Sequence, residues 1–302
     1  MSRVLVVGAG AVGCYFGLQL QRGGNEVVFL ARAAQANELN ARGLRFDSLG
    51  QHEQFRVQAT ADPRAANDCD LILLCVKSYD TAAAARELAE HIAADARVVC
   101  LQNGVTNHEI FERESNHSAI PAVVYVAAQM ESATHLQHNG AGNLLLGSPR
   151  GRSEQLEPLV RLLEASGIPC RVSDFVERDL WEKLIINCAF NAISACTGAK
   201  YGTMMNSPDA RDLMKEIIRE GVAVAHAIRL PLEFEAVKRA TWKVGETMHA
   251  AISSTAQDLQ RGKRTEIEFL NGEIVERAKQ FDIATPANQA MVALVRLIET
   301  TR

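Results

Sequence analysis

A glycine-rich turn placed directly after an apolar strand constrains this chain more than any other feature. The sequence VLVVGAGAVG joins an apolar run over 4–7 to an expected helix over 11–22. In a G-x-G-x-x-G turn the first glycine permits the bend, the second lets the backbone approach a pyrophosphate, and the third lets the helix pack on the strand. The helix N-terminus also favours an anion. The pattern predicts a dinucleotide site made by Gly8, Ala9, Gly10, Ala11, Val12 and Gly13, with a glycine turn that binds nothing as the alternative.

The first 150 residues alternate apolar runs with helical stretches. Helices are expected over 81–93 and 153–166 in addition to the first, and strands over 4–7, 27–31, 71–76 and 98–101. Strands that are apolar throughout are typical of a parallel sheet covered on both faces. Two shorter runs, 123–128 and 143–147, flank the turn-rich HNGAG at 138–142 and predict an antiparallel extension of that sheet.

The pattern changes after Pro169, and almost everything from residue 177 onward is expected to be helical. The expected helices, separated by glycine and proline residues, cover 177–195, 209–228, 233–248, 254–261, 266–281 and 287–299. The fold class predicted is therefore α/β, with an N-terminal Rossmann-type doubly wound domain over 1–170 and an all-helical domain over 171–302. A length of 302 residues also favours two domains.

Charge and cysteine content exclude several classes of protein. The chain has 32 Lys and Arg against 36 Asp and Glu, so a general electrostatic attraction to nucleic acid or anionic lipid is not expected. Seven scattered cysteines without a CxxC pair indicate neither a disulfide framework nor a zinc site, and they favour a reducing cytoplasm. The uncharged run over 4–20 imitates a signal peptide, but it holds four glycines and is short for a membrane span.

Three polar residues follow the apolar strands of the first half. Arg32 stands where dinucleotide-binding domains selective for NAD usually carry a carboxylate, so it favours NADPH by pairing with the 2′-phosphate. Lys77 in CVK and Asn103 in QNG each end a strand at the edge where open α/β sheets bind ligands. The alternatives are a solvated arginine or lysine and an ordinary Asn-Gly turn.

The helical half contains a polar stripe in WEKLIINCAFNAIS. Lys183, Asn187 and Asn191 recur at every fourth position among apolar residues and so lie on one helix face. Solvated helix faces usually carry Glu, Lys, Gln or Arg, and asparagine is a mediocre helix former. The stripe is therefore interpreted either as a ligand-binding surface or as an ordinary solvated face. Further on, Ser254 and Glu266 are also candidate site residues, but their spacing alone says little. Without further information, Ser254 is interpreted as an N-cap and Glu266 as a first-turn residue that complements the helix dipole.

Together these segments resemble the ketopantoate reductase (2-dehydropantoate 2-reductase) family over nearly the whole chain. The resemblance rests on GAGAVG, Arg32, CVK, QNG, the K-x-x-x-N-x-x-x-N stripe, and SSTAQD followed by RTEIEFLNG. It implies a Rossmann domain that holds NADPH, Lys183 as proton donor, and Glu266 as the residue that accepts a substrate hydroxyl and orients the lysine. It also implies substrate contacts by Asn103, Asn187, Asn191 and Ser254, and Lys77 and Asn103 beside the nicotinamide.

The resemblance implies NADPH-dependent reduction of a 2-oxo acid, 2-dehydropantoate to (R)-pantoate in pantothenate synthesis, without a metal. One position departs from the family pattern, because members that act on 2-dehydropantoate often carry a further asparagine where this chain has Tyr201-Gly202. Two alternatives follow: a 2-hydroxyacid dehydrogenase of the same fold acting on another 2-oxo acid, or a non-catalytic NADPH-binding sensor. The expected partner is a small-molecule substrate, with neither nucleic acid nor membrane, and the oligomeric state stays open, a homodimer included.

Overall fold

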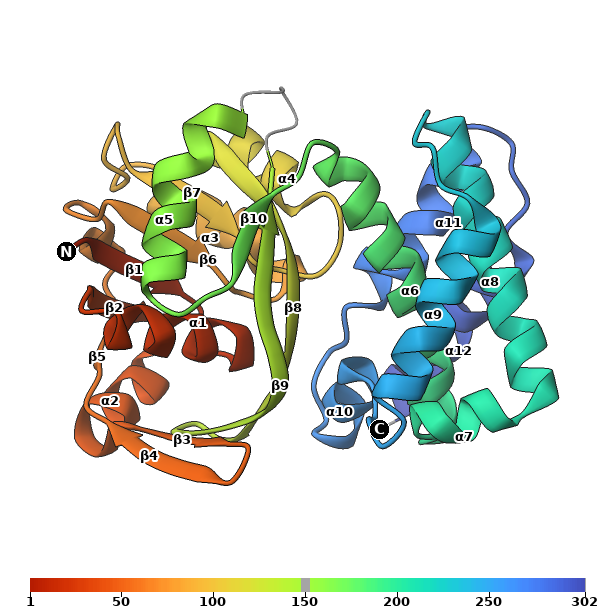
Figure 1. Ribbon diagram of the computed structural model, residues 1–302, viewed down its shortest axis with the longest axis horizontal. Helices are drawn as coiled ribbons and strands as arrows, with labels where there is room; N and C mark the ends of the chain where they lie inside the picture. The colour runs from red at the N-terminus through yellow and green to blue at the C-terminus, as the bar shows by residue number, and fades with distance from the viewer. Residues whose placement is uncertain (148–152, 302) are drawn as a thin grey trace. The chain divides into compact units, whose positions relative to one another are not determined.

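The computed structural model describes residues 1–147 and 153–301 and divides the chain into two compact units (Figure 1). The first unit comprises Met1–Val176 and the second Glu177–Arg302. The first unit is an α/β fold built on one sheet, and the second is helical, so the predicted fold class is confirmed. No helix in the described part of the chain has the length and apolarity needed to cross a membrane.

The sheet of the first unit has ten strands, with β4-β3-β9-β8-β7-β6-β1-β2-β5 as its main order and β10 pairing with β9. The six strands from β8 to β5 in this order are mutually parallel, and β9 runs antiparallel to β8. The strands are β1 (Arg3–Val7), β2 (Glu26–Leu30), β3 (Leu44–Ser48), β4 (Gln51–Phe55), β5 (Gln58–Thr60), β6 (Leu71–Leu74), β7 (Arg97–Cys100), β8 (Ala119–Ser132), β9 (His135–Leu146) and β10 (Cys170–Val172).

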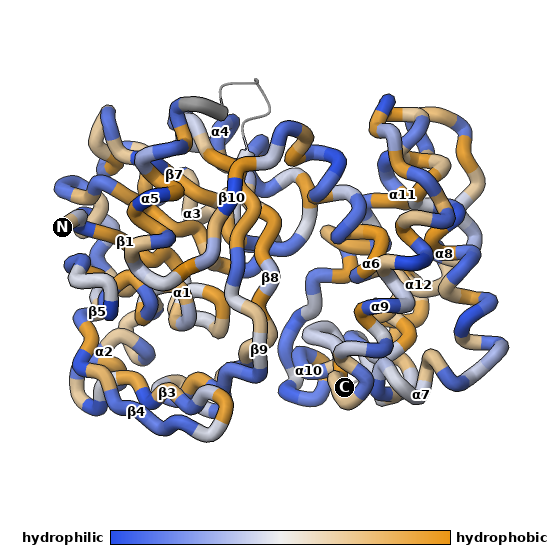
Figure 2. The backbone as a smooth tube through the Cα atoms, in the orientation of Figure 1, coloured by the Kyte–Doolittle hydropathy of each residue, from blue (hydrophilic) through white to orange (hydrophobic). Residues whose placement is uncertain are grey.

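Helices cover both faces of this sheet because successive side chains of its central strands point to opposite sides. Val4 and Val6 of β1 join a core with α1 and α5, whereas Leu5 and Val7 join a second core with α3 and α4. Figure 2 shows the hydrophobic strands inside the unit and a hydrophilic β4 at its edge. The helices are α1 (Ala11–Arg22), α2 (Ala33–Arg42), α3 (Thr81–Leu88), α4 (Asn107–Ser115) and α5 (Glu157–Ala165), with 3-10 turns η1 (Pro63–Ala66), η2 (Ser78–Asp80) and η3 (Ser153–Leu156).

The strand order reverses between β1 and β6, and this point positions the dinucleotide motif. The chain runs from β1 outward through β2 to β5, then returns to β6 on the other side of β1 and continues outward to β8. Open α/β sheets bind ligands beyond the carboxyl ends of the strands at such a reversal. The glycine turn follows β1 there, and the segment that leads to Lys77 follows β6.

The predicted turn HNGAG is wrong, because these residues lie inside the continuous strand β9, which pairs with β8 along its length. Gly140 and Gly142 have φ of 139° and 145°, and the β8–β9 register shifts beside them. A side chain on Gly142 would place its Cβ 1.9 Å from the Tyr15 hydroxyl oxygen. The glycines therefore bend a long strand over α1 instead of ending it.

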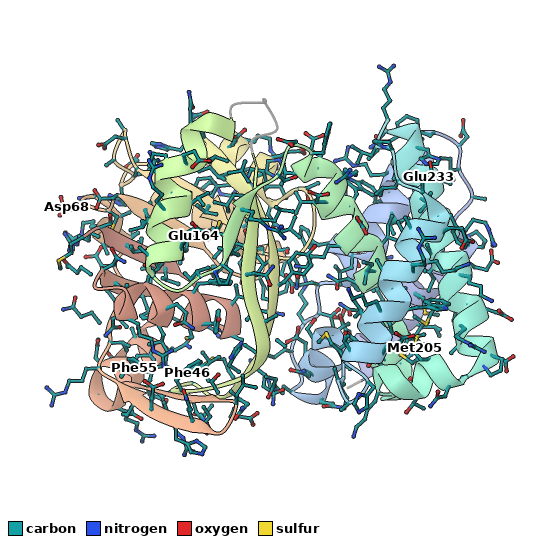
Figure 3. All side chains as sticks on the ribbon, viewed as in Figure 1. Phe46, Phe55, Asp68, Glu164, Met205 and Glu233 are labelled. Carbon is teal, nitrogen blue, oxygen red and sulfur yellow. The ribbon has the colours of Figure 1, made fainter. Side chains whose placement is uncertain are left out.

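A hairpin at the sheet edge was not predicted and is held by aromatic contacts. Phe46 on β3 and Phe55 on β4 lie side by side, with ring centroids 6.5 Å apart (Figure 3). The Arg22 guanidinium stands 5.0 Å from each ring centroid and forms an ion pair with Glu53. Four of the five residues of β4 are exposed, so their sequence lacks the alternation that marks a half-buried strand.

The second unit packs its helices around an apolar centre that includes Ile185, Phe190, Ile217 and Ile274. Its elements are α6 (Val176–Thr197), α7 (Tyr201–Asn206), α8 (Pro208–Ala227), α9 (Phe234–Thr247), α10 (Ser254–Gln260), η4 (Ile267–Phe269), α11 (Asn271–Lys279) and α12 (Pro286–Thr301). The single helix predicted over 266–281 is wrong. Leu270, with φ −112° and ψ −106°, lies outside the helical region and separates the 3-10 turn η4 from α11.

Candidate active site

The glycine turn has the geometry that close packing of β1, α1 and β6 requires. Gly8 has φ of 102°, and a Cβ there would lie 2.8 Å from the backbone nitrogen of Val76. A Cβ on Gly13 would lie 2.1 Å from the backbone oxygen of Gly8. A Cβ on Gly10, in contrast, would meet no atom of the described residues within 4 Å. The structure therefore needs Gly8 and Gly13 for packing and leaves the backbone at Gly10 open to approach.

The surroundings of this turn suit an anionic dinucleotide. The first turn of α1 has no acidic residue, so the partial positive charge of the helix N-terminus is not neutralised. The Gln35 amide donates to the Ala9 backbone oxygen at 2.6 Å and ties the turn to α2. Arg32 lies two residues after the end of β2, occupies the N-cap position of α2 and is exposed. The open backbone and the exposed guanidinium fit a cofactor that carries phosphates.

Lys77 and Asn103 follow the neighbouring strands β6 and β7, and hydrogen bonds join their loops. The Ser78 hydroxyl donates to the Asn103 backbone oxygen at 2.9 Å, and the Asn107 amide donates to the same oxygen at 2.6 Å. Both candidate residues are partly buried. The structure thus brings the two loops together at the carboxyl edge of the sheet, as strand order and parallel pairing require.

Three buried polar residues behind these loops were missed by the sequence analysis. The Thr81 hydroxyl donates to the Asn107 Oδ1 at 2.8 Å and accepts from the Gln102 amide at 2.6 Å. Buried polar groups need such partners, and together these three fix the starts of α3 and α4. Their only sequence signature is polar residues next to apolar runs, which does not distinguish a buried network from ordinary loops.

In the helical unit, Lys183 and Glu266 come from distant parts of the chain and interact. Lys183 lies on α6 and is partly buried, whereas Glu266 directly precedes η4 and is 7% exposed. Burial lowers the pKa of Lys183 to about 8 from its ordinary value of 10.5, and the negative charge of Glu266 opposes that change. The simpler interpretation of Glu266 as a first-turn helix residue is wrong, because it stands in the N-cap position of a 3-10 turn and makes no side-chain cap there.

Contacts with the C-terminal helix hold the Glu266 segment in place. The Thr265 backbone N–H donates to a Glu299 carboxylate oxygen at 2.6 Å. One turn further, Glu268 accepts two hydrogen bonds of 2.6 Å from the Arg296 guanidinium. A bidentate pair of this kind fixes orientation as well as distance. The placement of Glu266 therefore depends on α12 as well as on η4.

The other residues of the predicted helical site differ in burial. Asn187 is partly buried and Asn191 is 3% exposed, so the polar stripe of α6 is not a solvated face. Ser254 is exposed as the first residue of α10. Its interpretation as the N-cap is wrong: Ser253 is the N-cap, and its hydroxyl accepts from the Ala256 backbone N–H at 3.1 Å.

Ser253 also links α10 to the polar stripe, a contact that the sequence analysis missed. Its hydroxyl donates to the Asn191 backbone oxygen at 3.1 Å, and its N–H donates to the Ser194 hydroxyl at 3.3 Å. Because Ser254 is the next residue, this link fixes the start of α10 relative to Asn191. Among the described residues, no group of three or more His, Cys, Asp or Glu side chains is arranged to hold a metal ion.

The candidate residues fall into one set in each unit. Those of the first unit are Gly8, Ala9, Gly10, Ala11, Val12, Gly13, Arg32, Lys77 and Asn103. Those of the second unit are Lys183, Asn187, Asn191, Ser254 and Glu266. The first set surrounds a backbone suited to phosphates. The second combines an ammonium of lowered pKa, a carboxylate, two amides and a hydroxyl.

Comparison with known proteins assigns both units to one family. The family model "Ketopantoate reductase PanE/ApbA" matches residues 4–151, and its C-terminal counterpart matches residues 176–299. The chain belongs to the ketopantoate reductase family. Members of the ketopantoate reductase family are oxidoreductases, so the chemistry expected of the two residue sets is that of an enzyme.

Individual relatives within and around the ketopantoate reductase family agree with this assignment. A 2-dehydropantoate 2-reductase of Archaeoglobus fulgidus is 34% identical over 99% of both chains. The crystal structure of a PanE/ApbA family ketopantoate reductase from Ralstonia eutropha JMP134 superposes with a TM-score of 0.92, 42% identity and 99% coverage of both chains. D-mandelate dehydrogenase with NADH and anilino(oxo)acetate superposes with a TM-score of 0.94 and 99% coverage of both, but at 24% identity it shares only the fold.

Proposed function

We propose that this protein reduces 2-dehydropantoate to (R)-pantoate with NADPH as the hydride donor. Relatives named for this reaction support the proposal, since one is 34% identical over 99% of the chain. The observation that carries it is the pair on the helical unit, Lys183 with a pKa of about 8 beside the charge of Glu266. A carbonyl reduction needs a proton at the oxygen, and an amine that titrates near neutral pH is suited to donate it.

We assign cofactor binding to the residues at the reversal of strand order in the first unit. The backbone at Gly10 and the N-terminus of α1 would bind the pyrophosphate, and Arg32 would pair with the 2′-phosphate. Lys77 and Asn103 would hold the nicotinamide end from the loops after β6 and β7. NADPH, when bound, supplies the hydride for the carbonyl carbon.

We assign the proton and the charge stabilisation to Lys183. As the carbonyl oxygen gains negative charge, the Lys183 ammonium stabilises it and transfers a proton to it, which leaves a neutral amine and the alcohol product. Glu266 keeps the ammonium protonated in a partly buried setting and accepts a hydrogen bond from a substrate hydroxyl. Asn103, Asn187, Asn191 and Ser254 would orient the carboxylate and hydroxyl groups.

A second candidate function is that of a 2-hydroxyacid dehydrogenase of the same fold, which interconverts another 2-oxo acid and its 2-hydroxy acid. Its support is the aromatic pair of Phe190 and Tyr201, whose ring centroids are 4.2 Å apart next to Asn191. A tyrosine beside Asn191 suits a less hydroxylated or aryl substrate better than an additional amide does. The fold relative that binds anilino(oxo)acetate acts on substrates of that class by its name, D-mandelate dehydrogenase.

A steady-state assay of the full chain tests the proposal. NADPH absorbance is followed with 2-dehydropantoate, its deoxy analogue and phenylglyoxylate, and each series is repeated with NADH. We expect the highest kcat/KM for 2-dehydropantoate with NADPH, because a site that bonds a substrate hydroxyl discriminates strongly against its absence. A higher value for phenylglyoxylate would support the second candidate. Absence of turnover with every 2-oxo acid would favour a non-catalytic NADPH-binding protein.

A further inference from the structure

Tyr201 occupies a position from which it contacts the polar stripe of α6. It is the first residue of α7 and is 8% exposed. Its ring stacks on Phe190 with centroids 4.2 Å apart and an interplanar angle of 19°. Its hydroxyl donates to the Asn191 Oδ1 at 3.4 Å, which is long for a hydrogen bond of this type. The aromatic stack thus fixes the direction in which the hydroxyl meets the amide.

This contact leaves the two ends of the Asn191 amide in different states. The oxygen of a side-chain amide can accept two hydrogen bonds, and its NH2 group can donate two. The oxygen is engaged by Tyr201, whereas the Nδ2 has no hydrogen-bond partner within residues 1–147 and 153–301. The Asn191 residue is 3% exposed, but its Nδ2 is not fully sealed from solvent. Asn191 therefore has an unpartnered donor at its nitrogen, whereas its oxygen already accepts a hydrogen bond.

The backbone around Tyr201 links the same residue to the start of α10. Its N–H donates to the Ala251 backbone oxygen at 3.0 Å, and the Gly202 N–H donates to the His249 oxygen at 2.9 Å. The residues 249–251 lead directly to Ser253, whose hydroxyl bonds the Asn191 backbone. Tyr201 thus contacts both the side chain of Asn191 and the segment that places Ser254.

Packing of α7 on α9 fixes the position of Tyr201. Met205 points from α7 toward α9 (Figure 3), and a Cβ on Gly245 would lie 2.5 Å from its Cγ. The same added Cβ would lie 3.2 Å from the Cζ atom of the Phe190 ring. Gly245 therefore lets α9 close on both α7 and the aromatic ring on which Tyr201 stacks.

We propose that Tyr201 is a positioning residue that turns the Asn191 amide so that its NH2 group binds an acceptor oxygen of the 2-oxo acid, either of the carboxylate or of the carbonyl. This inference rests on the proposed function and specifies what Asn191 does in it. Asn191 acts as a donor only, so it selects for the oxo-acid part of the substrate. Discrimination for a substrate hydroxyl then belongs to other residues of the site.

The direct test is Tyr201→Phe, which keeps the aromatic stack and removes the hydroxyl. We expect the KM for the 2-oxo acid to rise about three- to tenfold with kcat within about twofold, because one orienting hydrogen bond is lost and the proton donor is untouched. Tyr125→Phe, at an exposed position of β8, is the matched control and should leave both constants unchanged. An unchanged KM in Tyr201→Phe overturns the inference.

Asn191→Asp tests the donor role separately, since it preserves size and the acceptor that Tyr201 binds but removes the NH2 group. We expect its KM to rise by more than about tenfold, because a carboxylate repels the anionic substrate and cannot donate. A KM close to that of wild type would show that Asn191 acts as an acceptor and would overturn the inference.

A double-mutant cycle distinguishes action through Asn191 from a general packing role. In an Asn191→Ala background, Tyr201→Phe should have no further effect on KM, because its target amide is gone. Additive effects in the double variant overturn the inference. A wild-type protein that reduces no 2-oxo acid contradicts the proposed function and this inference together. If the wild type is active and Tyr201→Phe has the same KM for the 2-oxo acid as the wild type, only this inference is contradicted.

Discussion

Glu266 lies close enough to Lys183 for its negative charge to raise the pKa of that ammonium, while burial lowers the same pKa by more. The net result is a pKa of about 8 in place of 10.5. A lysine with its ordinary pKa gives up a proton reluctantly near neutral pH, whereas one near 8 is protonated at pH 7 and donates readily. The two opposing effects make Lys183 a proton donor that is tuned by a neighbour over 80 residues away in sequence.

The pH dependence of reduction should follow Lys183. Only the protonated ammonium donates, so kcat/KM for the 2-oxo acid should be constant below the pKa and fall as pH rises through about 8. Glu266→Gln removes the charge that raises this pKa, so the alkaline fall should move to lower pH. Glu276→Gln, an exposed carboxylate of α11 that pairs with Lys279, is the control and should leave the profile in place. A profile that stays fixed or moves to higher pH in Glu266→Gln would contradict the assignment.

Loss of the ammonium itself should be far more costly. Lys183→Met keeps the length of the side chain but removes its charge and its proton, and we expect kcat to fall by about 10²–10⁴. The dissociation constant for NADPH should stay close to that of wild type, because the predicted cofactor residues belong to the other unit. Near-normal kcat in a folded sample, checked by circular dichroism, would reject Lys183 as the proton donor.

Arg32 should determine the choice between the two nicotinamide cofactors. A charge-assisted contact to a phosphate contributes about 1.5–3 kcal/mol, so Arg32→Ala should weaken NADPH binding about 10- to 100-fold and NADH binding little. Fluorescence titration with each cofactor measures both constants. Arg42→Ala, at the other end of α2, is the matched control. Equal losses for NADPH and NADH would mean that Arg32 does not contact the 2′-phosphate.

Much of the fold followed from local patterns. The central strands β1, β2, β6 and β7 have runs of buried apolar residues because both their faces are covered, and several helices of the second unit are separated by glycine or proline, so these elements were visible in the sequence. Helices α2, α4 and α7 and strands β3, β4, β5 and β10 were not predicted, and the polar edge strand β4 and the short helix α7 show why. β4 is stabilised by pairing with β3 and by the contacts of Phe55, and α7 by packing on α9, and neither cause is local.

The candidate site was predictable to a similar degree. The spacing of Lys183, Asn187 and Asn191 places them on one helix face, and the glycine motif carries its own geometric reason. No pattern in the sequence joins Asn191 to Ser253 or to Tyr201, because those contacts depend on how α6, α7 and α10 pack. The lowered pKa of Lys183 likewise depends on burial in the folded unit.

Alanine substitutions at two glycines of the motif should affect different properties, cofactor binding in one variant and stability in the other. Gly10→Ala adds a Cβ that meets nothing within 4 Å in the described part of the chain, so the free energy of unfolding should change by only about 1 kcal/mol or less, while NADPH binding weakens about tenfold or more. Gly13→Ala places its Cβ 2.1 Å from the Gly8 oxygen and should destabilise the fold by about 1–3 kcal/mol or more. Urea unfolding and cofactor titration of both variants measure the difference. Normal NADPH affinity in Gly10→Ala would reject close approach of the cofactor at that backbone.

A competition assay tests the proposed reaction most directly. The full chain is incubated with equal concentrations of 2-dehydropantoate and phenylglyoxylate and a limiting amount of NADPH. Both hydroxy acid products are then quantified by chiral chromatography. At low conversion of the substrates, the product ratio gives the ratio of the two kcat/KM values. We expect (R)-pantoate as the dominant product, in an amount equal to the NADPH consumed, and almost none with Lys183→Met. Mandelate as the dominant product, or NADPH left unconsumed, would contradict it.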